Sequence, residues 1–182
     1  METTKNVIYI MMLRALLSLI ILEMVTRNVD LKQDKFVLIS TFIITVYLLD
    51  IADCAMITKN RECRSIAYQI ADKIVDQLVL GYWTFIIIPI IDPENYETIK
   101  ILWYYRLIGI ILLAITQNPK TCFLFGNYVE MGILLSVVGW WKYPIVVFLL
   151  FLIKVIEEII LHSGLIDYFK FRNKITQIFT GI

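Results

Sequence analysis

The sequence predicts an all-α fold, an integral membrane bundle of six transmembrane helices in one domain spanning residues 1–182. Hydrophobic residues make up 59% of the chain and the mean hydropathy is +0.76, whereas soluble domains contain about 45–50% apolar residues. The apolar residues form long, nearly unbroken blocks, and a helix of about 20 such residues crosses the hydrocarbon core. Strands are not expected, because the blocks lack the alternation of apolar and polar residues that a half-buried strand shows. Open strands would also leave backbone groups unsatisfied in lipid.

Six apolar blocks follow one another, separated by short polar or charged segments that are typical of turns. The first block does not resemble a cleaved signal peptide, because it is too long and contains Arg14 and Glu23. The predicted spans are residues 6–25, 36–57, 65–91, 99–116, 121–141 and 143–161.

Lysine and arginine are unevenly distributed between the two sides of the predicted bundle. With a cytoplasmic N-terminus, eight of these residues lie inside and five outside. The positive-inside rule therefore predicts that both termini and the loop between the second and third spans are cytoplasmic. The basic tail, residues 163–182, interleaves cations with aromatic residues. It either lies along an anionic membrane surface or is an ordinary positive cytoplasmic end.

Several other classes of function receive no support from the composition. The net charge is only +1, so nothing indicates binding to nucleic acid. The three cysteines form no CxxC pair, which indicates free thiols rather than a disulfide framework or a metal site. His162 is the single histidine and lies near the end of an apolar block, where a structural role is favoured.

Four aspartates are placed where a membrane protein seldom carries charge. Asp50 and Asp53 lie near the inner end of the second span, and Asp72 and Asp76 lie in the first turns of the third. Their i,i+3 and i,i+4 spacings put each pair on one helix face. The short loop makes the two helices antiparallel neighbours, so all four carboxylates are expected to converge.

Convergent carboxylates repel one another and need cations to remain ionised in a poor solvent. Hard oxygen ligands suit Mg²⁺ or Mn²⁺, and Mg²⁺ commonly binds substrate phosphates as well. We therefore expect a divalent-cation site for a phosphate-bearing substrate at the membrane surface. The alternative is that the acids pair with nearby side-chain cations, namely Lys59, Arg61, Arg64 and Lys73.

The acidic pattern resembles the CDP-alcohol phosphatidyltransferases, whose motif D-x2-D-G-x2-A-R-x8-G-x3-D-x3-D spans the second and third of six transmembrane helices. Asp50, Asp53, Asp72 and Asp76 match its four acids, with one inserted residue that places Lys59 at the motif arginine. Residues 6–14 resemble the entry to the first helix of the family, and Arg106 lies where many members carry an arginine in the fourth. Two motif glycines are replaced, by Cys54 and Tyr68, which would crowd the nucleotide pocket.

The resemblance implies a reaction and a set of roles. A phosphatidyl or other phospho-alcohol group would pass from a CDP-alcohol lipid, such as CDP-diacylglycerol, to a small alcohol acceptor, with release of CMP. Asp50, Asp53 and Asp72 would hold Mg²⁺ or Mn²⁺, and Asp76, a candidate fourth ligand, would be the general base. The acceptor would be inositol, an inositol phosphate, glycerol 3-phosphate or serine. The family also implies a homodimer in the lipid bilayer.

Basic residues would contact the phosphates in this reading. Lys59 would assist the diphosphate, with Arg61 and Arg64 as nearby substitutes. Arg14 and Arg106, both in the middle of a span, would bind an acceptor phosphate or instead form charge pairs inside the bundle, for example with Glu130 or Glu23. Lys154 is expected to pair with Glu157 or Glu158.

Two further classes compete with an enzyme. A cation or proton transporter could use the acids as an ion path, but the sequence shows no internal repeat of the kind common in transporters. A non-catalytic membrane scaffold is the other alternative, and the chain contains no GxxxG motif. Neither explains why four acids gather around one turn.

Overall fold

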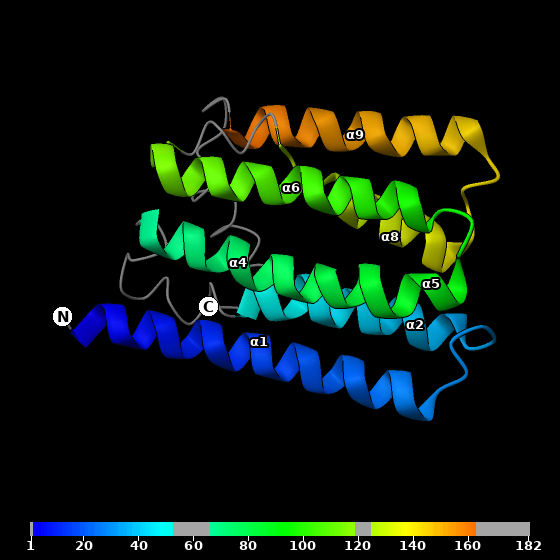
Figure 1. The fold of residues 1–182 in the computed structure, drawn as a ribbon, viewed down its shortest axis with the longest axis horizontal. Coiled ribbons are helices and arrows are strands. Elements are labelled where there is room, and N and C mark those ends of the chain that lie inside the picture. The colour runs from blue at the N-terminus through cyan, green and yellow to red at the C-terminus, as the bar shows by residue number, and fades with distance from the viewer. Residues whose placement is uncertain (1, 53–65, 119–124, 163–182) are drawn as a thin grey trace, which may run out of the picture.

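The computed structural model describes residues 2–52, 66–118 and 125–162, and regular structure within these ranges is helical throughout. The elements, in chain order, are α1 (Glu2–Asn28), α2 (Lys35–Phe42), the π-helical η1 (Ile43–Leu48), α4 (Ile66–Tyr82), the π-helical η3 (Trp83–Ile87), α5 (Ile88–Ile91), α6 (Tyr96–Thr116), α8 (Tyr128–Val138) and α9 (Pro144–His162). α2 and η1 belong to one helix that continues to Ala52, and α4, η3 and α5 form another. Within the described residues, α1, α4 and α8 run in one direction, and α2, α6 and α9 run in the opposite one (Figure 1).

Four helical stretches are long and apolar enough to cross a membrane: Ile8–Asn28, Lys35–Ala52, Tyr68–Ile91 and Tyr96–Thr116. The helical class and the apolar spanning character of the first four predicted blocks are therefore confirmed. α9, with 19 residues, agrees with the sixth predicted block to within one residue at each end.

α8 is shorter than the block from which it was predicted. Its 11 residues measure about 16 Å at about 1.5 Å per residue, roughly half the hydrocarbon thickness. Gly139 ends the helix in the left-handed conformation, φ 77°, and its N–H donates to the carbonyls of Leu135 and Ser136. The helix therefore ends three residues before the predicted block does, since hydropathy does not register a glycine stop. Residues 119–124 lie outside the described residues.

The two π-helical segments are joined by a buried side-chain hydrogen bond. Pro89 lacks an N–H for the preceding turn, which favours a widened helix at η3. In η1 the Thr45 hydroxyl donates to the Thr41 carbonyl at 2.8 Å, and this bond competes with the regular backbone hydrogen bonds of the helix. Trp83 of η3 donates its indole N–H to Thr45 Oγ1 at 3.3 Å, so the two irregular segments are joined directly.

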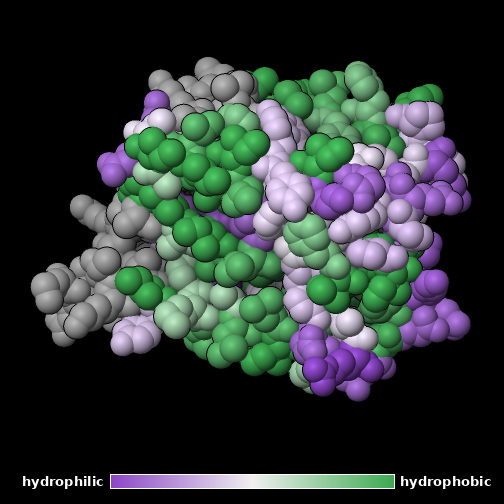
Figure 2. Space-filling view, in the orientation of Figure 1, coloured by the Kyte–Doolittle hydropathy of each residue, from purple (hydrophilic) through white to green (hydrophobic). Residues whose placement is uncertain are grey.

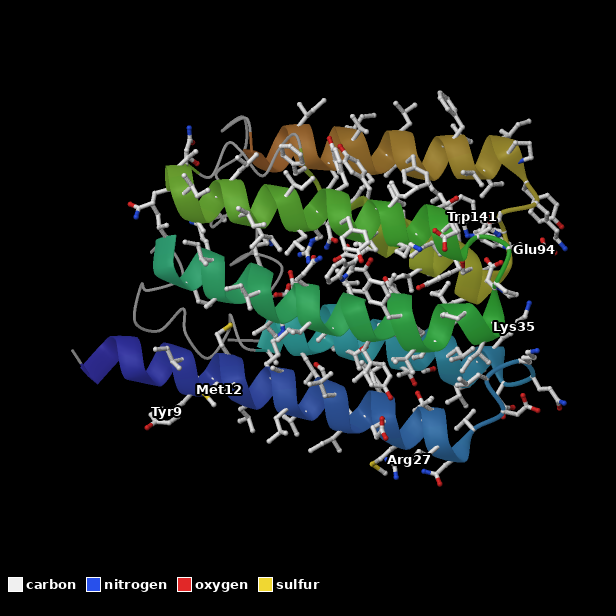
Figure 3. All side chains as sticks on the ribbon, viewed as in Figure 1. Tyr9, Met12, Arg27, Lys35, Glu94 and Trp141 are labelled. Atoms are coloured by element: carbon white, nitrogen blue, oxygen red, sulfur yellow. The ribbon has the colours of Figure 1, made fainter. Side chains whose placement is uncertain are left out.

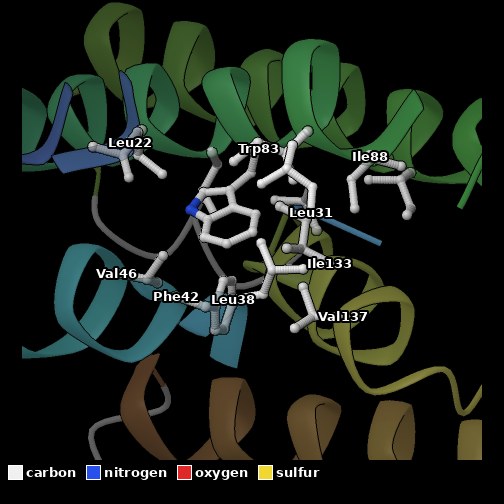
Figure 4. Packing of buried hydrophobic residues seen from close by; sticks show 14 residues of the cluster. Leu22, Leu31, Leu38, Phe42, Val46, Trp83, Ile88, Ile133 and Val137 are labelled. Carbon is white, nitrogen blue, oxygen red and sulfur yellow. The ribbon is translucent and has the colours of Figure 1, made fainter. Parts of the chain in front are cut away.

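The main hydrophobic core surrounds Trp83, which is fully buried. Its ring packs edge-on against Phe42, with centroids 5.4 Å apart, and aliphatic side chains from α1, α5 and α8 complete the cluster (Figure 4). Aromatic pairs of this geometry contribute about 0.5–1.5 kcal/mol beyond the area that they bury. This core packs the helix formed by α2 and η1, which continues to Ala52, against the helix formed by α4 and η3, and these two helices carry the carboxylates that meet in the cluster.

The outer surface reverses the pattern of a soluble protein. Figure 2 shows apolar residues over the sides of the bundle and hydrophilic residues at the end where the described connections lie. Tyr9 and Met12 point outward from α1 and are 68% and 63% exposed, whereas Arg27 and Glu94 lie near the connections (Figure 3). Apolar sides with a polar end suit a bundle surrounded by lipid.

Candidate functional site

Three aspartates from two neighbouring helices meet inside the bundle. Asp50 lies near the end of the helix formed by α2 and η1, and Asp72 and Asp76 lie one turn apart on α4. One carboxylate oxygen of each lies within 4.8 Å of the others. The convergence expected from the spacing is therefore present for these three residues, and Asp53 lies outside the described residues.

Arg14, in the middle of α1, reaches all three carboxylates. Its Nη1 lies 2.8 Å from Asp72 Oδ1 and 3.1 Å from Asp50 Oδ1, and its Nη2 donates to Asp76 Oδ1. The residue is only 3% exposed. Because α1 and α4 are packed neighbours, the guanidinium of Arg14 reaches the carboxylates on α4 directly.

Arg106 approaches Asp76 from α6 and is held by a neighbouring amide. Its Nη2 donates to Asp76 Oδ2 at 2.9 Å and its Nη1 donates to Gln77 Oε1 at 3.0 Å. The Gln77 Nε2 group donates to the Trp103 carbonyl at 3.0 Å, and the Trp103 indole donates to the Gln77 carbonyl at 3.1 Å. Both ends of the amide are occupied, so the guanidinium of Arg106 has a fixed orientation toward Asp76.

Lys73 completes the cluster, 3.4 Å from Asp72 Oδ2 and 3.7 Å from Asp76 Oδ2. Its side chain is partly exposed, unlike those of Arg14 and Arg106. Among the described residues, three carboxylates thus face the three cations Arg14, Lys73 and Arg106. Side-chain cations therefore balance the negative charge of the carboxylates, which offsets part of the cost of burying them in a poor solvent.

The donor set also fits a divalent cation. Carboxylate oxygens are the ligands that Mg²⁺ and Mn²⁺ prefer. Octahedral ligands about 2.1 Å from an ion lie at most about 4.2 Å apart, so oxygens within 4.8 Å need only a small inward movement. Arg14, however, bonds one oxygen of each carboxylate, so the guanidinium stands where a cation would bind.

The other predicted site residues fall into two groups. Tyr68 is buried against Met11 and Val75 between α1 and α4, one turn before Asp72, where the resemblance expects a glycine. The remaining predicted contacts to nucleotide or phosphate lie outside the described residues, and these are Cys54, Lys59, Arg61 and Arg64.

Arg14 and Arg106 form charge pairs inside the bundle, which was one of the two expectations for them, but their partners are the aspartates and not the glutamates named as examples. Glu23 accepts from Arg27 at 2.6 Å and from the Tyr82 hydroxyl at 2.5 Å, while Glu130 lies 3.7 Å from Lys154. Lys154 also pairs with Glu157 at 3.1 Å, as the sequence predicted.

Sequence reasoning missed that Arg14 and Arg106 would join the aspartates. The sequence does contain a signal that could have indicated these contacts, since each arginine lies in the middle of an apolar span, where a cation needs a buried partner. It also missed Gln77 as a member of the site. Gln77 directly follows Asp76 in an aliphatic stretch, and a polar side chain there indicates a buried polar contact near Asp76.

Comparisons with protein-family models, with curated proteins and with solved structures find no match to this chain.

Proposed function

We propose that the chain is a membrane phosphatidyltransferase of the CDP-alcohol type. It would transfer a phosphatidyl or similar group from a CDP-alcohol, such as CDP-diacylglycerol, to a small alcohol and release CMP. The observation that carries the proposal is the meeting of Asp50, Asp72 and Asp76, each of which has one carboxylate oxygen within 4.8 Å of those of the other two. These residues hold three of the four acidic positions in the motif that the sequence resembles.

The aspartates would have two different roles, metal binding and proton removal. Asp50, Asp53 and Asp72 would hold Mg²⁺ or Mn²⁺, which when bound neutralises the diphosphate and stabilises CMP as leaving group. Asp76 would accept the proton of the acceptor hydroxyl. Arg106 bonds Asp76 Oδ2 and so orients the carboxylate.

The basic residues of the site suit a substrate with several phosphate oxygens. Lys59, Arg61 and Arg64 would contact the diphosphate, and Lys73 at the partly exposed edge of the cluster would add a further cation. Guanidinium groups bind phosphate oxygens through short, charge-assisted hydrogen bonds. Tyr68 in place of a glycine would narrow the nucleotide site beside Asp72.

The proposal places this site in a six-span protein. Both termini and the loop 53–65 would face the cytoplasm, and two copies would form a homodimer. The support is the excess of lysine and arginine on that side of the sequence and the four apolar helices long enough to span.

A binding experiment tests the proposal before any acceptor is known. Purified protein should bind CDP-diacylglycerol in the presence of Mg²⁺, lose the lipid when a chelator is added, and regain it with Mg²⁺ or Mn²⁺. Asp72→Asn should weaken binding as the chelator does. The control is Asp34→Asn, which makes the same change at an exposed position outside the cluster. Binding that ignores both the chelator and Asp72→Asn would refute the proposal.

Asp76→Asn separates binding from proton removal. The variant keeps the size of the side chain but loses the basic oxygen, so it should retain metal-dependent binding and lose transfer by about 10²–10⁴-fold. Each variant is assayed well below its melting temperature. Turnover near the parent rate would assign proton removal to another residue, and loss of metal binding would make Asp76 a ligand.

A scaffold without catalysis is the second candidate, and the neutral charge cluster favours it. Ion pairs from Arg14 and Arg106 tie α1, α2, α4 and α6 together whether or not a cation binds. This candidate predicts that the parent protein binds neither Mn²⁺ nor CDP-diacylglycerol, so the same experiment separates the two.

A further inference from the structure

Arg14 is the cation, among the described residues, that contacts all three carboxylates of the cluster. It bonds the Oδ1 atom of Asp50, Asp72 and Asp76, at 3.1 Å and 2.8 Å for the first two. Lys73 and Arg106 bond the second oxygens, the Oδ2 atoms of Asp72 and Asp76. Arg14 therefore occupies the centre of the cluster, and the other two cations lie at its edges.

The net charge that the cluster presents to an incoming cation depends on Arg14. With it, the described carboxylates and cations sum to zero, so a divalent cation alone would add two positive charges to a poorly solvated site. Without it, the sum is −1, which attracts a divalent cation. Uncompensated charge is costly in such surroundings. A diphosphate that arrives with the divalent cation removes the cost, because its negative oxygens balance the ion and can accept hydrogen bonds from the displaced guanidinium.

We propose that Arg14 is an internal counter-cation, and that a divalent cation enters the aspartate cluster only in exchange with it. The exchange rests on the proposed function, since a diphosphate-bearing lipid is what draws the guanidinium off the carboxylates. Binding of the cation and of the lipid is then coupled, and by linkage each raises the affinity for the other by the same factor. The device keeps the cluster closed and neutral until both are present.

Arg14→Gln tests the exchange with a readout that does not depend on turnover. Free Mn²⁺ gives an electron paramagnetic resonance signal that falls as the ion binds, so binding to purified protein is counted directly. The expected result is at least tenfold tighter Mn²⁺ binding by Arg14→Gln than by the parent. Arg14→Lys keeps the charge and should bind Mn²⁺ as weakly as the parent. Arg27→Gln is the matched control, because it makes the same change at an exposed position on α1 and should leave Mn²⁺ binding unchanged.

A second measurement uses the parent protein, so it does not depend on the stability of a variant. Mn²⁺ binding by the parent should tighten at least tenfold when vesicles contain CDP-diacylglycerol instead of phosphatidylcholine alone. The same lipid should change Mn²⁺ binding by Arg14→Gln much less.

Two results would overturn the exchange. One is Mn²⁺ binding by the parent, without lipid, as tight as that by Arg14→Gln, which would leave the proposed function standing. The other is Mn²⁺ binding by the parent that does not tighten although the vesicles contain CDP-diacylglycerol and the protein binds this lipid. Tight Mn²⁺ binding by Arg14→Gln, in a protein that binds no CDP-diacylglycerol in any form, would support the counter-cation and refute the transferase.

Discussion

Asp76→Asn should destabilise the bundle strongly, because Asp76 bridges two buried guanidinium groups. Its carboxylate bonds Arg14 through Oδ1 and Arg106 through Oδ2, the latter at 2.9 Å, and its side chain is 12% exposed. The variant leaves two carboxylates against three cations. Removing one partner of a buried ion pair costs about 3–5 kcal/mol. For a chain of this size 1 kcal/mol corresponds to about 2–4 °C, so we expect a fall in melting temperature of about 6–20 °C.

The assay is thermal unfolding of purified protein in detergent, followed by circular dichroism of the helices. Asp34→Asn is the control and should stay within about 2 °C of the parent. The double variant Asp76→Asn, Arg106→Gln restores equal numbers of acids and cations, so its loss should be smaller than the sum of the single losses. Additive losses, or a loss from Asp76→Asn no larger than that from Asp34→Asn, would refute the reasoning that the cluster is held by charge.

Three further predictions test other parts of the structure. Trp83→Ala should lower the free energy of unfolding by about 3–5 kcal/mol, measured by the same melts, because the indole fills the main core; a change below about 1 kcal/mol would contradict that packing. Gln77→Leu should cost about 1–3 kcal/mol by leaving Arg106 and the Trp103 carbonyl without their partner, and Gln77→Glu, which keeps the acceptor, should cost less; equal losses from the two variants would exclude this role. In a cysteine-free background, cysteines at positions 61 and 95 should be labelled from opposite sides of the membrane, and labelling from the same side would refute the six-span topology.

The spans were predictable because hydropathy sums over many residues. Four long apolar blocks became helices whose ends lie close to the predicted ones. Summed hydropathy does not register two local features of the backbone. Gly139 adds nothing polar to the fifth block, yet its left-handed turn ends α8. Pro89 sits inside the third block, and the widening that it favours at η3 concerns backbone geometry, which hydropathy does not measure.

The convergence of the aspartates was predictable for a different reason. Asp72 and Asp76 share a face by their spacing, and the short loop fixes the neighbour that carries Asp50. Arg14 and Arg106 lie on helices whose neighbours depend on how the whole bundle packs. Their depth can be read from the sequence, but the direction in which they point around the helix cannot. For that reason the suggested pairs with Glu23 and Glu130 were wrong.

The most direct test of the proposed transferase is release of CMP from CDP-diacylglycerol. Purified protein with Mg²⁺ is given one alcohol at a time, namely inositol, an inositol phosphate, glycerol 3-phosphate or serine, and CMP is followed by chromatography. The account predicts that CMP appears with one of these alcohols, stops on chelation, and falls by about 10²–10⁴-fold in Asp76→Asn, while Asp34→Asn keeps the parent rate. No CMP with any of the alcohols, from protein that melts as a folded bundle, would contradict it.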